Sequence, residues 1–150
     1  MIHKFSFKLR PWSKSNEKAF NRYGFNYKTD KARDFEVAIR HFLDTQWPRK
    51  LIATPVMVCY VFYWKNHVRG DLNNCMKSLD DAFNKKVWAD DKLIVASAPF
   101  VRYSDKERIE VYVQMVEEKE HDLLAMCDFL HEIILMEKRN DLSGVRRRYE

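Results

Sequence analysis

The chain has 150 residues, enough for one domain with a buried core, and its 46% hydrophobic and 33% charged content is ordinary for a globular protein. No apolar run reaches the length of a membrane span, and the first residues lack the apolar core of a signal peptide. The three cysteines, Cys59, Cys75 and Cys127, show no paired spacing. We therefore expect reduced thiols and a cytoplasmic location.

The net charge of +5 is unevenly distributed along the chain. Residues 1–50 hold 12 Lys and Arg against 5 Asp and Glu, residues 51–116 hold 9 against 8, and residues 117–150 hold 6 against 9. Aromatic residues such as Trp12 and Tyr23 are interleaved with the N-terminal positive charge. Cationic side chains bind the phosphate backbone, and aromatic rings stack on bases. The composition of the N-terminal third therefore favours nucleic-acid binding. A basic surface without a ligand accounts for the charge equally well.

The expected elements begin with a short half-buried strand at residues 5–9, where Phe and Leu alternate with polar side chains. Residues 10–28 show no clean period and are expected to form a long basic loop. A helix should follow, capped by Thr29 or Asp30 and ending near Thr45.

The middle of the chain predicts a buried strand followed by an amphipathic helix. Residues 55–64, PVMVCYVFYW, are rich in Val, Tyr and Phe and should form a central strand. Asp71 is placed to cap the helix that follows. The inner face of that helix comprises Leu72, Met76, Leu79 and Phe83, and its polar face Asn73, Lys77, Asp80 and Asn84. We expect Asp80 and Asp81 to be ordinary surface acids.

The last third predicts two strands and a helix. Residues 93–101 and 108–116 are expected to form a β-hairpin that turns at Ser104 and Asp105. Residues 117–139 predict a long helix. Its buried face should comprise Leu123, Met126 or Cys127, Leu130, and Ile133 or Ile134. The expected fold is α/β of the α+β type, one domain with a small mixed sheet flanked by helices in the order β-α-β-α-β-β-α.

Carboxylates lie at both ends of the central helical unit, at Asp71 and at Asp90-Asp91. Mg²⁺ takes oxygen ligands and keeps several waters, so one or two carboxylates and a substrate phosphate suffice to hold it. Such an ion activates water and neutralises charge on the phosphate. Lys77 would hold the same phosphate. Each residue also has a structural interpretation, as a helix cap for Asp71, a turn for Asp90 and Asp91, and a solvated lysine for Lys77.

These segments together resemble the RusA family of Holliday junction resolvases, which bacteria and phages carry. The family has a basic strand end followed by D-L-D-N-x-x-K, and residues 69–77, RGDLNNCMK, are similar to it. The family's W-x-D-D is matched by residues 88–91, WADD, and its opening turn resembles residues 9–12, LRPW. The resemblance spans roughly residues 5–116.

The resemblance implies a homodimer that binds four-way or branched DNA and nicks two opposing strands with Mg²⁺ or Mn²⁺, in bacterial or phage-infected host cytoplasm. It implies a RusA-like domain at residues 1–116. Residues 117–150 depart from the family, and we expect them to form a helical extension with a basic tail, packed on that domain or at a dimer interface. The implied catalytic residues are Asp71, Asn73, Lys77 and Asp91, of which Asp71, Asn73 and Asp91 would bind the metal. The sequence itself adds Asp90 as a further metal ligand or as a group that supports one. DNA contacts are implied for Arg10, Lys14, Asn16, Lys18, Arg22, Lys28, Arg69 and Asn74.

Asn73 departs from the family, which has Asp at this position. An amide oxygen binds Mg²⁺ without bringing a negative charge, so it is a poorer ligand. Asn73 is either an introduced inactivating substitution or a natural feature of a member that cleaves weakly. Two further functions stay open, a non-enzymatic branched-DNA-binding module and a protein that docks on replication or recombination machinery through residues 117–150. The last arginines would form a basic tail that touches DNA.

Overall fold

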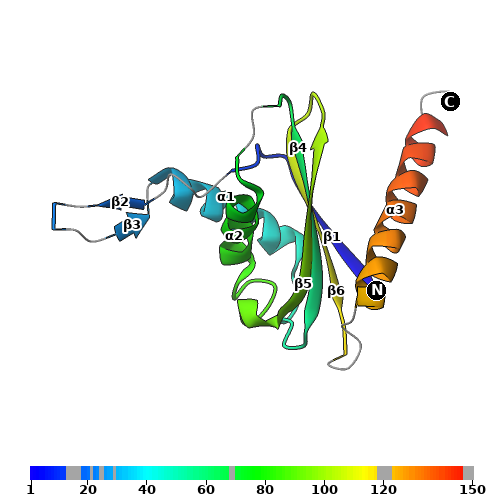
Figure 1. The fold of residues 1–150 in the computed structure, drawn as a ribbon, viewed down its shortest axis with the longest axis horizontal. Coiled ribbons are helices and arrows are strands. Elements are labelled where there is room, and N and C mark those ends of the chain that lie inside the picture. The colour runs from blue at the N-terminus through cyan, green and yellow to red at the C-terminus, as the bar shows by residue number, and fades with distance from the viewer. Residues whose placement is uncertain are drawn as a thin grey trace.

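The computed structural model describes residues 1–12, 18–20, 22–23, 26–28, 30–67, 70–117 and 123–146. Its main sheet has four strands, in the spatial order β1 (Ile2–Phe7), β6 (Arg108–Met115), β4 (Val56–Trp64) and β5 (Ile94–Tyr103). Helices α1 (Asp30–Gln46) and α2 (Leu72–Phe83) cover one face, and α3 (Leu123–Arg146) covers the other (Figure 1). The expected mixed sheet and its element order are confirmed.

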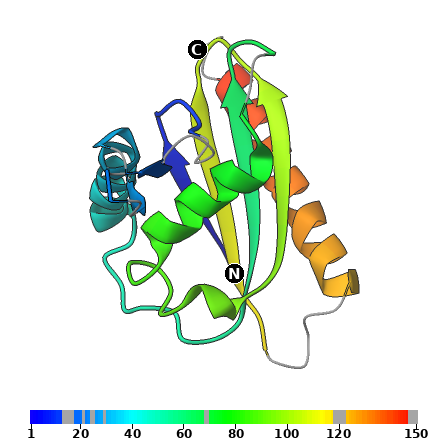
Figure 2. The same cartoon turned by 60° about the vertical axis from the view of Figure 1, so that its left-hand side comes forward.

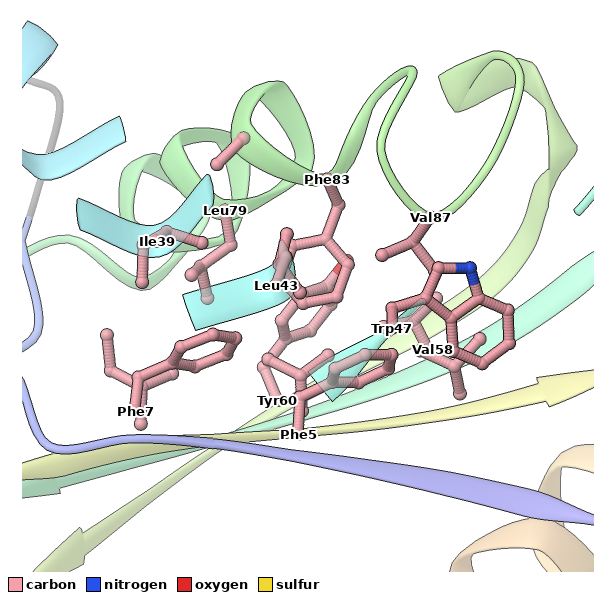
Figure 3. Packing of buried hydrophobic residues seen from close by; sticks show 14 of the residues in the cluster. Phe5, Phe7, Ile39, Leu43, Trp47, Val58, Tyr60, Leu79, Phe83 and Val87 are labelled. Atoms are coloured by element: carbon pink, nitrogen blue, oxygen red, sulfur yellow. The ribbon is translucent and has the colours of Figure 1, made fainter. Parts of the chain in front are cut away.

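The central strand is β4, whose nine residues are all buried. Successive side chains of a strand point to opposite faces. Val58 and Tyr60 therefore belong to the core beneath α1 and α2. Cys59 and Val61 belong to a second core beneath α3. Figure 3 shows the first core, in which side chains of β1, α1, β4 and α2 converge, among them Phe5, Phe7, Ile39, Leu43, Leu79 and Phe83.

The predicted hairpin around Ser104 is wrong, although both of its strands form. β5 pairs with β4 in parallel and β6 pairs with β4 antiparallel, so β4 lies between them. The reason is the apolar run of β4, because a strand buried on both faces needs strand partners at both edges to pair its backbone groups. The connection therefore passes over the end of β4, where Ser104 donates its backbone N–H to the Trp64 carbonyl at 2.9 Å.

Several helices and strands begin or end at different residues from those predicted. Residues 10–28 were expected to be a loop, but they include an antiparallel ribbon of β2 (Lys18–Phe20) and β3 (Asn26–Lys28), which stands away from the main sheet in Figure 1. β1 lies earlier than the predicted strand, and α1 follows its prediction closely. The C-terminal helix begins at Leu123 and ends at Arg146, later than predicted at both ends.

α3 buries most of the predicted face, with two differences. Ile133 is buried, and Met126 and Leu130 pack against the second core as predicted. Phe129, which was not predicted, is only 1% exposed, whereas Leu123 is 80% exposed. Apolar residues occupy more than one stripe of this helix, so periodicity alone did not identify the buried one. Neither α3 nor another helix of the described residues is long and apolar enough to cross a membrane.

A polar network joins α3 to the sheet around Glu110, which is 6% exposed. The Tyr112 hydroxyl lies 3.0 Å from a Glu110 oxygen and 3.2 Å from a Glu137 oxygen of α3, so two carboxylates share it. Lys4 Nζ and Arg108 Nε lie 3.3 and 3.1 Å from the Glu110 carboxylate. The buried charge is therefore paired and hydrogen-bonded, as burial of a carboxylate requires.

Replacing Glu110 by Gln is expected to lower the free energy of unfolding by about 2 kcal/mol at neutral pH, because it removes the buried charge that Lys4, Arg108 and the tyrosine hydroxyl are hydrogen-bonded to or paired with. Burial by itself raises the pKa of Glu110, but Lys4 and the hydrogen bonds from Arg108 and Tyr112 outweigh burial and lower the pKa from its usual value. The stability due to ionised Glu110 is thus present above the unfolded-state pKa and lost as pH falls through the lower folded-state pKa. Urea unfolding between neutral and strongly acidic pH measures both effects.

The matched control for this prediction is Glu132→Gln on the exposed surface of α3. It removes the same charge without a buried partner and should change stability by less than about 0.5 kcal/mol. An equal pH dependence in the Glu110 variant and the unaltered chain would contradict the network's role.

Candidate metal and nucleic-acid site

The start of α2 is fixed by Asp71, whose backbone is extended and whose side chain caps the helix. Its Oδ1 accepts the backbone N–H of Asn74 at 3.0 Å, and its carbonyl accepts the N–H of Cys75 at 3.0 Å. The predicted N-cap is confirmed. Because the capping bond uses one carboxylate oxygen, the structural role of Asp71 leaves the second oxygen for a ligand.

Two substitutions separate these roles of Asp71. Asp71→Ala should lower the free energy of unfolding by about 1 kcal/mol through loss of the cap, whereas Asp71→Asn should change it by only a few tenths, because Asn caps as well as Asp. Both remove the negative charge. Thermal unfolding of the two variants measures the difference, and equal destabilisation by both would show that charge, not capping, stabilises this end of α2.

The polar face of α2 presents exposed Asn73 and Lys77, one helical turn apart, with Asn74 half-buried beside them. Asp80, expected to be a surface acid, is instead half-buried and accepts a hydrogen bond from the Tyr60 hydroxyl. Burial and the charge of nearby Asp91 raise the pKa of Asp80 to about 6, while the bond from Tyr60 opposes them. Sequence periodicity placed Asp80 on the polar face but could not show that Tyr60 reaches it from β4.

After α2, side chains of the W-x-D-D segment at residues 88–91 make hydrogen bonds that fix its conformation. Trp88 is fully buried, and its Nε1 donates to Asp91 Oδ1 at 2.9 Å. Asp90 is exposed and accepts the backbone N–H of Lys92 at 2.9 Å, which caps the short helix η2 (Asp91–Leu93). Both acids thus have a local structural role, and Asp91 is oriented by a core residue.

The two acidic ends do not meet within one chain. Asp71 enters α2 after the end of β4, and Asp91 follows α2 before β5, which starts opposite the start of β4. Figure 2 shows this crossover, with α2 lying across the sheet and η2 beside the beginning of β5. A helix of twelve residues is about 18 Å long. No group of three or more His, Cys, Asp or Glu side chains in the described residues is placed to hold a metal ion. The described residues of a single chain therefore do not assemble a Mg²⁺ site.

The predicted DNA contacts are only partly described. Arg10 is exposed, with its Nε 3.8 Å from a Glu107 oxygen, and the Arg22 guanidinium lies 4.9 Å from the centre of the Tyr23 ring between β2 and β3. Lys14, Asn16, Arg69, Arg147 and Arg148 lie outside the described residues, as do the side chains of Lys18, Lys28 and Arg146.

Comparison with known proteins identifies a family for most of the chain. Residues 8–114 match the family model described as endodeoxyribonuclease RusA. A search of curated proteins found no match. The matched region contains α1, α2 and both acidic segments, ends within β6 and leaves α3 outside. The family is one of nucleases that act on DNA.

Proposed function

Since this chain belongs to the endodeoxyribonuclease RusA family, we propose that it is a structure-specific endonuclease that resolves Holliday junctions by paired, symmetric nicks. The observation that carries the proposal is the family match over residues 8–114, which includes the acidic helix start at 69–77 and the W-x-D-D segment at 88–91. Capping and orientation of these acids by backbone and by Trp88 give each a defined position.

The proposed working unit is a homodimer, because two symmetric cuts need two sites related by a two-fold axis. Each copy would contribute a nuclease domain at residues 1–116, with 117–150 as a C-terminal extension. The packing of Phe129 and Ile133 beneath the sheet supports an extension that belongs to the same body. Leu123 and Leu124 are exposed on this extension and could contact a protein partner.

The proposed cofactor is Mg²⁺ or Mn²⁺, with Asp71, Asn73, Asp90 and Asp91 as ligands. When bound, the ion supplies the attacking water and charge neutralisation that phosphodiester hydrolysis needs. Lys77, exposed on the same face as Asn73, would bind the phosphate being cut. The part of one chain that the structure describes does not bring all four of these residues together.

We propose that the basic N-terminal third of the chain forms the DNA-binding surface and that the protein acts on DNA in the cytoplasm. The β2–β3 ribbon stands away from the sheet, and Arg22 stacked on Tyr23 combines a cation with an aromatic face (Figure 1). Cations would hold the phosphate backbone and make binding fall as salt rises.

A synthetic four-way junction with each strand labelled in turn tests the proposal. In Mg²⁺ or Mn²⁺ the chain should nick two opposing strands at symmetric positions and leave a duplex of the same sequence uncut. Asp91→Asn should abolish nicking while junction binding persists. Cleavage of the duplex, or unrelated single nicks, would contradict the proposal. Tight junction binding without cleavage would favour the alternative suggested by Asn73, a non-catalytic branched-DNA-binding protein.

A further inference from the structure

The turn that follows α2 carries a lysine in a backbone conformation that favours glycine. Lys85 is the first residue after the C-cap Asn84, and its φ is 59°, within the left-handed region. Among the described residues other than glycine, only Lys85 has a positive φ. Glycine adopts this conformation without the steric cost that a Cβ brings, and it is the usual residue just after a helix C-cap. For the fold by itself, glycine would therefore be the better residue at position 85.

Backbone hydrogen bonds and buried neighbours hold this turn in place. Lys85 donates its backbone N–H to the Trp88 carbonyl at 2.7 Å, and Val87 donates its N–H to the Phe83 carbonyl at 2.8 Å. Phe83, Val87 and Trp88 are fully buried, and Figure 3 shows Phe83 and Val87 in the first core, whereas the Lys85 side chain is exposed. Strained residues in fixed surroundings cluster at active sites and ligand-binding sites. The strain at Lys85 therefore points to a function for its side chain.

A second loop brings further cations to this turn. Ile52 donates its backbone N–H to the Val87 carbonyl at 2.8 Å and accepts the N–H of Ala89 at 2.9 Å, so the chain after α1 runs beside the chain after α2. Figure 2 shows these two loops together at the end of the sheet where β4 and β5 begin. The cationic residues on the two loops are Arg49, Lys50, Lys85, Lys86 and Lys92.

Only part of this positive charge is neutralised within the described part of the chain. Lys86 Nζ lies 2.6 Å from an Asp44 oxygen. No carboxylate of the described residues forms an ion pair with Lys50, Lys85 or Lys92, and all three side chains are exposed. Exposed cations gathered in one place raise the local concentration of anionic ligands. The two loops therefore have the charge that a polyanion requires.

On the basis of the proposed function, we propose that these two loops form a phosphate-binding surface for one arm of the DNA substrate, with Lys85 as its principal contact. The surface lies beside Asp91, because Trp88 of the same segment donates its Nε1 to Asp91 at 2.9 Å. A lysine ammonium binds phosphate as a compact charge, without reading the base sequence. None of the cations on these loops is among the DNA contacts that the family resemblance implies. The surface would hold a DNA arm beside the acids that are proposed to bind the metal ion.

Lys85→Gly tests the surface, because it removes the charge and suits the backbone conformation at the same time. The variant should have a higher melting temperature than the unaltered chain, since it relieves the left-handed conformation. It should also bind a four-way junction about fivefold more weakly, with a salt dependence of the binding constant that is lower by about one phosphate contact. Lys85→Arg keeps the charge and should bind as the unaltered chain does. Fluorescence anisotropy of a labelled junction in EDTA, over a series of salt concentrations, measures binding without cleavage.

The matched control is Lys138→Gln, which removes one positive charge from the exposed surface of α3, on the opposite face of the sheet (Figure 1). It should leave junction binding and its salt dependence unchanged. Unchanged binding by Lys85→Gly, or equal weakening by Lys138→Gln, would overturn the phosphate-binding surface and leave the nuclease assignment intact. Equal weakening by Lys85→Arg would also overturn it, because the effect would then come from the turn and not from the charge. An unaltered chain that does not bind a four-way junction would overturn the proposed function itself.

Discussion

Asn73→Asp is expected to raise the rate of junction cleavage in Mg²⁺ about 100-fold, which corresponds to about 2.7 kcal/mol of transition-state stabilisation. The substitution restores the family's carboxylate at an exposed position one turn before Lys77. At the proposed ligand position, a carboxylate would add the negative charge that an amide lacks, which would increase the affinity of the site for the ion. Single-turnover cleavage of a labelled four-way junction, at saturating protein, measures the rate without the contribution of junction binding.

The matched control is Asn74→Asp, which makes the same chemical change at the neighbouring position. Asn74 is half-buried, whereas Asn73 and Lys77 are exposed, and successive residues of a helix with 3.6 residues per turn project about 100° apart. No gain in rate is expected. Equal gains from both variants would assign the effect to net charge, not to a ligand. No cleavage by Asn73→Asp, with junction binding intact, would favour a protein that binds branched DNA without cutting it.

Phe129→Ala is expected to lower the free energy of unfolding by about 3 to 4 kcal/mol, the usual cost of deleting a large buried aromatic side chain. Phe129 is 1% exposed and belongs to the core between α3 and β4, together with Met57, Val61 and Tyr112. Urea unfolding followed by circular dichroism measures the change, and reduced cooperativity would show that α3 separates before the sheet unfolds.

The comparison is Leu124→Ala on the same helix, where the side chain is 72% exposed and the change should stay within about 0.5 kcal/mol. Deletion of residues 117–150 extends the test, because it would uncover the second face of the sheet. A truncated chain that folds with unchanged stability would show that α3 is a dispensable extension. A truncated chain that keeps its oligomeric state but loses a bound protein would assign the exposed side of α3 to a partner.

Short-range patterns predicted much of this fold. Asp71 was identified as a cap from its position before an apolar repeat, and the structure shows the capping bond to Asn74. The apolar run at residues 55–64 was identified as a central strand, and its nine residues in β4 are all buried. Helix capping, strand alternation and helical periodicity each depend on residues that are close together in the sequence, so they can be inferred from the sequence alone.

Contacts between distant segments could not be predicted in this way. Two strands joined by a short turn usually pair, yet β5 and β6 are separated by β4 because β4 needs partners at both edges. The buried stripe of α3 was likewise ambiguous, since the helix carries apolar residues on neighbouring stripes and only the sheet selects Phe129 and Ile133.

The sequence by itself determined the α+β class, the cap and inner face of α2, and the resemblance of the acidic segments to a nuclease family. Only the tertiary structure showed that α2 is a crossover between parallel strands, with Asp71 and Asp91 at its two ends. The physical reason is that spacing along the chain gives the residues at the ends of a helix. Their separation in space depends on the direction of the strands that the helix connects.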